Sequence, residues 1–188
     1  MEPSDETLCA RVAERDERAF DLLVSRYQAR AYRIAWSIVR DADEARDLSQ
    51  EAFLRLYERA GRFEGRARFS TWFYRLLVNV CLDHRRRHRW WHRVLGGSGA
   101  SDPDAPSALD RQPAPDPSPD EDAARKQTMT RVWAELERLS PQQRAAVRLQ
   151  LEGLATAEIA EVLDCSEATA RVHLHRAMTT LRKTVGSR

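Results

Sequence analysis

Residues 156–175 read TAEIAEVLDCSEATARVHLH, and this stretch has the length and pattern of a helix-turn-helix motif. Ile159, Ala160 and Leu163 are spaced so that a first helix would turn them inward. Ala160 is small enough to let a second helix cross close to the first. The Asp-Cys-Ser sequence that follows suits a tight turn, and Ser166 can cap the second helix.

The predicted second helix, residues 167–184, has two different faces. Its inner stripe consists of Ala170, Leu174, Ala177 and Leu181. Its outer face would enter the major groove of duplex DNA and carries Glu167, Thr169, Arg171, Val172, His175 and Arg176. Two alternatives remain at this point: a DNA-reading motif, or an ordinary helical hairpin with a solvated basic face. Asp164 departs from the common motif, which usually has Gly in the turn, although Asp tolerates a left-handed backbone better than most residues.

The residues before this motif predict one more short helix. Ser140-Pro141-Gln142-Gln143 combines a capping Ser, a Pro at the first helical position and a Gln three residues after the cap. Gly153 is expected to end that helix. A further helix is expected to begin near Arg125, with an apolar stripe of Val132, Trp133, Leu136 and Leu139.

The most unusual stretch covers residues 61–93 and reads GRFEGRARFSTWFYRLLVNVCLDHRRRHRWWHR, with nine Arg and two acidic residues. Ser70 is predicted to cap a helix that runs to about Trp91. One face of that helix would collect Trp72, Arg75, Asn79, Asp83 and Arg86, because their spacings follow the helical repeat. A neighbouring apolar face would collect Phe73, Leu76, Leu77 and Val80.

Aromatic and cationic side chains interleaved in this way suit unpaired bases, since a ring stacks on a base while Arg holds the backbone. The preceding loop would help to hold an extruded base through Arg66, Arg68, Ser70 and Thr71. The alternative interpretation is a core Trp72 beside a solvated run of Arg. For Trp90 and Trp91, this plainer interpretation is the favoured one.

Charge and composition divide the chain into segments. The net charge of +2 conceals two basic blocks, residues 61–93 and 124–188, on either side of an acidic one at 101–123. Residues 96–123 contain GGSG and six Pro with few large apolar groups, which predicts a flexible linker. Near the N-terminus, apolar periodicity predicts a helix over 16–39, and Asp41 opens another. The predicted architecture is all-α: two small helical domains joined by a flexible acidic, Pro-rich linker.

Several functional classes find no support in the sequence. We see no catalytic constellation, metal-ligand pattern or cofactor motif, and no apolar run long enough for membrane insertion. The acidic N-terminus does not have the pattern of a signal peptide, so we expect a cytoplasmic protein. Cys81 and Cys165 are expected to be small buried side chains, and for Cys9 an exposed thiol is a second alternative.

These motifs, in this order and separated by this linker, resemble the extracytoplasmic-function group of the sigma-70 family of RNA polymerase sigma factors. The resemblance includes ERDERAFDLLVSRYQARAYRIAWSIVRDADEARDLSQEAFLRLY, RFEGRARFSTWFYRLLVNVCLDHRRR, LSPQQRAAVRLQLEGLATAEIAEVL and the helix around TARVHLHRAMTTLRK. It implies that residues 10–93 form sigma region 2, that 94–124 form the linker and that 125–185 form region 4. Val172 and His173 stand where the group often has Ser and Arg.

The resemblance also implies partners and roles. Region 2 would read the melted −10 element of promoter DNA, and region 4 would read the duplex −35 element. A surface for the β′ clamp helices of core RNA polymerase would include Asp47, Gln50, Glu51, Leu54 and Arg55, and region 4 would touch the β flap. An anti-sigma factor is the expected regulatory partner.

Two other functional classes compete with this interpretation. An autonomous helix-turn-helix regulator would bind duplex DNA without polymerase, usually as a dimer. A helical enzyme acting on nucleic acid would need an acidic set of metal ligands, which is not visible in the sequence.

Overall fold

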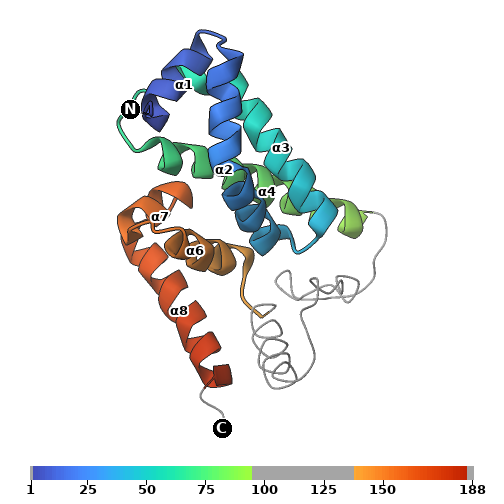
Figure 1. Ribbon diagram of the computed structural model, residues 1–188. Helices are drawn as coiled ribbons and strands as arrows, with labels where there is room; N and C mark the ends of the chain where they lie inside the picture. Colours follow the sequence, from blue (N-terminus) through green and yellow to red (C-terminus); the bar gives the residue numbers. More distant parts are fainter. Residues whose placement is uncertain (1, 95–137, 186–188) are drawn as a thin grey trace, which may run out of the picture.

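Helices make up all the regular secondary structure in the part of the chain that the computed structural model describes, residues 2–94 and 138–185. The elements, shown in Figure 1, are α1 (Asp5–Ala13), α2 (Glu17–Val39), α3 (Ala42–Arg59), the 3-10 turn η1 (Ala60–Arg62), α4 (Phe69–Val94), α6 (Pro141–Leu151), α7 (Thr156–Val162) and α8 (Glu167–Val185). The all-α prediction is confirmed for these residues. The predicted linker beyond Val94, and the helix expected from Arg125 as far as residue 137, lie outside them.

Aspartate side chains cap the two long helices α2 and α3; the sequence predicted this for Asp41, and the cap by Asp16 is a finding of the structure. Asp16 precedes α2 and accepts a hydrogen bond from the Ala19 N–H at 3.1 Å. Asp41 precedes α3 and accepts from the Glu44 N–H at 2.8 Å. Each carboxylate satisfies an N–H that has no partner within the helix, and its negative charge suits the positive end of the helix dipole.

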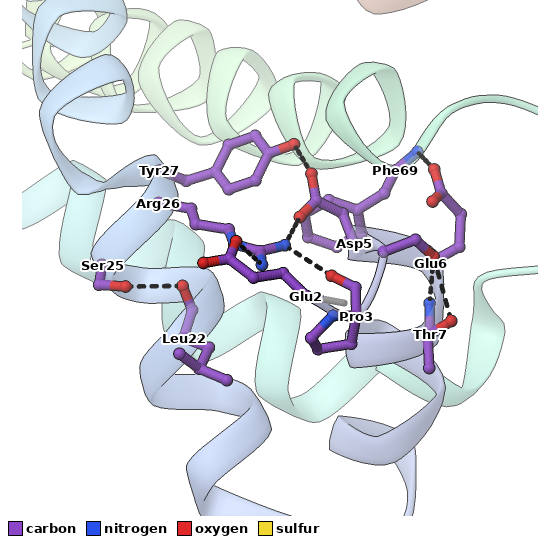
Figure 2. Close-up of polar contacts among 11 residues, drawn as sticks. Glu2, Pro3, Asp5, Glu6, Thr7, Leu22, Ser25, Arg26, Tyr27 and Phe69 are labelled. Atoms are coloured by element: carbon purple, nitrogen blue, oxygen red, sulfur yellow. Dashed lines mark hydrogen bonds and ion pairs between the residues drawn. The ribbon is translucent and has the colours of Figure 1, made fainter.

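The sequence interpretation placed no helix before residue 16, but α1 is present and organises the start of α4. Figure 2 shows Glu6 of α1 accepting a hydrogen bond from the Phe69 N–H, at 3.2 Å. The predicted cap by Ser70 is therefore wrong, because α4 begins one residue earlier and Ser70 lies inside it. A carboxylate from a distant helix replaces the local hydroxyl as the acceptor.

Asp5 ties α1 to α2 in the same region. Its carboxylate accepts from the Tyr27 hydroxyl at 2.5 Å and pairs with Arg26 at 2.6 Å, as Figure 2 shows. Burial and the neighbouring Asp5 carboxylate raise the pKa of Tyr27 well above its ordinary value, so that the phenol stays protonated and donates.

The helix α1 also decides between the two alternatives for Cys9. This side chain is fully buried, and its sulfur lies 4.0 Å from the Ala60 carbonyl oxygen. Burial, reinforced by the nearby Glu6 charge, raises the pKa of the Cys9 thiol to about 11. Cys9 is not an exposed thiol because α1 turns it toward η1. Cys81 is buried as predicted, and Cys165 is partly exposed.

The core of the first part is built around aromatic rings. Phe73 is fully buried, and its ring lies 4.9 Å from Phe53 and 5.6 Å from Tyr27, measured between centroids. Phe69 packs against Tyr27 at 5.3 Å. The predicted apolar face of α4 is confirmed at Phe73, Leu77 and Val80, whereas Leu76 is half-buried.

Sequence signals in the second part are also confirmed. Ser140 and Gln143 form a reciprocal capping box at the start of α6, with each side chain bonded to the other residue's N–H. Gly153 follows the end of α6 with φ +93°, which costs Gly little. The small core beneath α6, α7 and α8 contains Leu149, Ile159, Ala170 and Leu174, together with Ala145 and Ala146.

The two helical parts pack against each other, α6 on α2 and α7 on α4 (Figure 1). Arg144 of α6 donates to the Ser37 and Ile38 carbonyl oxygens at 2.7 and 3.1 Å. Glu152, whose side chain is only 6% exposed, pairs with Arg33 at 3.2 Å and Arg30 at 3.5 Å. The two helical parts, residues 2–94 and 138–185, are therefore in direct contact.

Candidate nucleic-acid interface

The turn between α7 and α8 has the geometry that the motif requires. Asp164 adopts the left-handed conformation, φ +52°, at the position where Gly is usual. The Cys165 N–H then reaches the Ala160 carbonyl oxygen at 3.0 Å. Ser166 accepts from the Thr169 N–H at 3.1 Å and caps α8 as predicted. The helix-turn-helix is thus formed by this sequence despite the missing Gly.

The outer face of α8 is open to solvent. Ala170, Leu174 and Ala177 are buried on the inner side, which leaves the opposite side free to meet a ligand. All six residues predicted to meet duplex DNA are exposed: Glu167, Thr169, Arg171, Val172, His175 and Arg176. Helix α8 extends away from α1–α4 (Figure 1), so this face has room for a large partner.

Charge on this face is concentrated near the start of α8. Arg171 pairs with Glu167 at 2.7 Å, one turn earlier, and both side chains stay more than half exposed. Partial burial, with a contribution from Arg176, lowers the pKa of His173 below its ordinary value. His173 is therefore neutral near pH 7, and the positive charge of the face comes from Arg171 and Arg176.

The loop before α4 presents its arginines to solvent. The Arg66 side chain is 86% exposed and pairs with Glu64 at 2.7 Å, and the Arg68 side chain is 77% exposed. Further along α4, Asn79 is exposed and Asp83 pairs with Arg86. These groups form the edge of the predicted single-strand site, together with Arg75 and Ser70, which are both half-buried.

The centre of that predicted site is covered. Thr71 is 1% exposed, and its hydroxyl donates to Glu158 of α7 at 3.2 Å. Trp72 is 9% exposed, and its ring packs against Phe63 and Phe69 at centroid distances of 5.3 and 6.1 Å. In this conformation Trp72 belongs to the core, and its role in base stacking stays a prediction that requires the ring to be uncovered.

Two clefts mark where the second part of the molecule lies over the polar face of α4. One, of about 320 Å³, lies between Arg66, Trp72 and Arg75 on one side and Glu161 of α7 on the other. The second, of about 410 Å³, lies between Asn79 and Arg86 on one side and the residues around Pro141 and Asp164 on the other. Both clefts are lined by residues that the sequence assigned to DNA binding.

Sequence reasoning missed the role of Glu158. One carboxylate oxygen accepts from the Ala155 N–H at 2.9 Å and starts α7, while the other meets Thr71 and lies 3.9 Å from Arg68. A Glu three residues after a helix start is a recognisable signal for the first contact. The sequence offers no signal for the second contact, which depends on how the two parts pack.

The predicted polymerase-facing surface on α3 has a consistent exposure pattern. Asp47 and Gln50 are exposed, and the apolar side chain of Leu54 is 63% exposed beside them. Glu51 and Arg55 pair at 2.6 Å on the same helix. Leu48, Ala52 and Leu56 are buried on the other side of α3. The five predicted residues therefore form one accessible strip.

Neither residues 2–94 nor 138–185 contain a group of three His, Cys, Asp or Glu side chains placed to hold a metal ion. Across the same ranges, each helix is too short or too polar to cross a membrane.

Family models match both helical parts of the chain. The model of sigma-70 region 2 matches residues 23–91, and the model of sigma-70 region 4 matches residues 129–181. The chain is 32% identical over 188 residues to the RNA polymerase sigma-H factor of Pseudomonas aeruginosa, covering 95% of this chain and 92% of that protein. It is 30% identical to the ECF RNA polymerase sigma-E factor of Escherichia coli, covering 93% and 90%.

Solved structures share the fold. The structure of CnrH in complex with the cytosolic domain of CnrY matches with a TM-score of 0.68 at 21% identity, covering 98% of this chain and 99% of that one. The sigma factor RpoE in complex with the anti-sigma factor NepR from Bartonella quintana matches with a TM-score of 0.66 at 20% identity, covering 89% and 97%.

Proposed function

The chain belongs to the extracytoplasmic-function group of the sigma-70 family of RNA polymerase sigma factors, and from that premise we propose how its helices share the work of transcription initiation. As a sigma factor it binds core RNA polymerase, directs it to promoters and promotes strand opening. Separate roles for α4 and α8 are supported by one observation. The two matched regions follow each other along the chain, and each contains one helix with a basic polar face.

Duplex reading of the −35 element falls to α8. Its exposed face offers Arg171 and Arg176 to guanine edges or phosphates, with Thr169 and His175 as further hydrogen-bonding groups. Phosphate contacts should supply most of the affinity and make it sensitive to salt.

Capture of the melted −10 strand falls to α4 and the loop before it. Arg66 and Arg68 would hold the backbone, while Arg75 and Asn79 lie further along the same face. This surface acts by binding only the open form of the DNA, which shifts the opening equilibrium without any catalytic group.

Docking on polymerase falls to the exposed strip of α3. Asp47, Gln50 and Leu54 offer polar and apolar contacts to the β′ clamp helices, beside the Glu51–Arg55 pair. Region 4 would touch the β flap. The protein would act where the polymerase is, in the bacterial cytoplasm.

An anti-sigma factor is the regulatory partner that we propose. Support comes from the structural neighbours, because RpoE is described in complex with the anti-sigma factor NepR, and CnrH in complex with the cytosolic domain of CnrY.

Assembly with core polymerase tests the proposal. The purified chain, added to core enzyme, should form a stable complex and support transcription from a promoter selected with that complex. The triple change Asp47→Ala, Gln50→Ala and Leu54→Ala should abolish the complex while circular dichroism shows an unchanged helix content.

The competing function predicts the opposite dependence on polymerase. An autonomous regulator would bind a specific duplex tightly as the free chain and would gain nothing from core enzyme. Failure to assemble with core polymerase, together with tight specific duplex binding by the free chain, would contradict the sigma assignment.

A further inference from the structure

The exposed face of α8 has an apolar centre. Val172 is 45% exposed, and at 3.6 residues per turn it lies about 160° around the helix from both Ala170 and Leu174, which are buried. Ala168 is also exposed, and its position four residues earlier places it beside Val172. These two side chains, the Ala168–Val172 strip, therefore form the part of α8 that points most directly away from the core of region 4.

Polar groups flank this strip and do not cover it. Arg171 lies about 100° around the helix from Val172 and pairs with Glu167 at 2.7 Å. On the other side, the Thr169 hydroxyl lies 2.8 Å from the Ser166 hydroxyl. Both polar side chains thus have partners within the first two turns of α8 and its cap, and the apolar strip stays open between them.

An apolar side chain at the centre of a groove-facing helix limits which base edge it can meet. The major-groove edges of the bases present hydrogen-bond donors, hydrogen-bond acceptors and one apolar group, the C5-methyl of thymine. Val has neither a donor nor an acceptor in its side chain. Against a G·C pair it would remove water from polar atoms without replacing their hydrogen bonds, which costs free energy. Against the thymine methyl, both surfaces are apolar and their burial is favourable.

From these observations we propose that Val172 is a specificity-determining residue: its side chain, with Ala168 beside it, contacts the C5-methyl group of one thymine in the −35 duplex. The proposal rests on the proposed function of α8. Burial of one methyl group against Val172 raises the affinity about fourfold. Arg171 and Arg176 then supply charge, and Val172 selects an A·T pair at one position.

A double-mutant cycle between protein and DNA tests this contact. The full-length chain is assembled with core polymerase, and the promoter selected with that complex supplies the −35 duplex. Each thymine of the −35 element is replaced in turn by deoxyuridine, which lacks only the C5-methyl group, and competition gel shifts measure the affinity. For the parent chain, one replacement should weaken binding about fourfold. For Val172→Ser, the same replacement should change binding by less than about 1.5-fold, because the apolar partner of the methyl group is gone.

Met178→Ser is the matched control, because it also replaces an exposed apolar side chain of α8 by Ser. Met178 is 39% exposed and lies about 120° around the helix from Val172, outside the Ala168–Val172 strip. This variant should keep the fourfold effect of deoxyuridine. Val172→Ile, which stays apolar and branched, should keep it as well. An equal deoxyuridine effect in Val172→Ser and in the parent chain would overturn the proposal, since the methyl group would then act without Val172.

Results with the parent chain alone can also contradict the role of Val172. A −35 element without an A·T pair, or one in which every thymine tolerates the loss of its methyl group, excludes the contact. Transcription from the selected promoter separates this failure from failure of the proposed function. A holoenzyme that initiates there without any methyl dependence keeps its sigma function and loses only this inference, whereas a chain that does not assemble with core polymerase overturns both.

Discussion

The polar faces of α4 and α8 carry similar residue types but have different surroundings. On α8, the Arg171 side chain is 69% exposed, and its ion-pair partner Glu167 lies on the same helix. On α4, Thr71 is 1% exposed, and its hydrogen-bond partner Glu158 lies on another domain. Under the proposed assignment, duplex reading by α8 thus needs no rearrangement of the chain, whereas single-strand capture by α4 requires region 4 to move. This order matches initiation, in which duplex DNA is met before it is opened.

The largest effect should come from replacing Arg144. Its loss should separate the two helical parts and expose the polar face of α4, which would then resemble that of α8. Arg144→Met removes two charge-assisted hydrogen bonds to α2 carbonyls, each worth ~1.5–3 kcal/mol. The closed form should be disfavoured by about 3 kcal/mol, roughly a hundredfold. Small-angle scattering on the full-length chain should show expansion, whereas Arg182→Met, an exposed position on α8, should leave the radius unchanged. A compact Arg144→Met variant would mean that polar contacts do not hold the domains together.

A substitution at Arg171 tests the duplex-reading role proposed for the exposed face of α8. Arg171→Ala in the assembled holoenzyme should weaken binding to the −35 duplex by ~1–3 kcal/mol, because a base-edge or phosphate contact is lost. Competition gel shifts with intact and −35-substituted promoters measure this effect. A loss of equal size on both promoters would assign Arg171 to phosphate contact alone.

Asn79 tests the α4 side with less risk to folding than Trp72. Trp72→Ala would remove a packed ring at a cost of about 3–5 kcal/mol, so its effect on opening would be mixed with instability. Asn79 is exposed, and Asn79→Ala should reduce promoter opening about three- to tenfold while duplex affinity stays unchanged. Permanganate reactivity of the −10 region reports opening. Normal reactivity in this variant would remove Asn79 from the single-strand site.

The smallest effect concerns the turn of the helix-turn-helix. Asp164→Gly removes the cost of a left-handed backbone at a non-Gly residue, partly offset by the entropy that Gly loses on folding. We expect a gain of about 0.5 kcal/mol in the free energy of unfolding, with α4 still covered. Thermal denaturation followed by circular dichroism measures the gain. A loss of stability would show that the Asp164 side chain contributes more than its backbone costs.

Local sequence signals predicted most of the helices. The Ser140 capping box, the Asp41 cap and the turn at Asp164 depend on residues a few positions apart, so their chemistry is visible in the sequence. Apolar periodicity likewise identified the buried side of α4, including Phe73.

Contacts between distant segments could not be predicted in this way. The Phe69 N–H is bonded to Glu6, 63 residues away, and so the start of α4 was misplaced at Ser70. Burial of Cys9 was left open because the short helix that buries it, α1, was not predicted. The Thr71–Glu158 contact spans 87 residues and two domains. For this reason the sequence predicts which residues form a single-strand site, but it does not predict that α7 covers two of them, Thr71 and Trp72.

The separation between the two domains tests the central claim most directly. Fluorophores attached through Glu17→Cys on α2 and Met178→Cys on α8, in a Cys165→Ser background, avoid the buried Cys9 and Cys81. Single-molecule energy transfer should show one high-efficiency, closed population for the free chain and a low-efficiency population once core polymerase is bound. The same efficiency in both states would contradict the account, because α4 would then be either open from the start or covered in the holoenzyme.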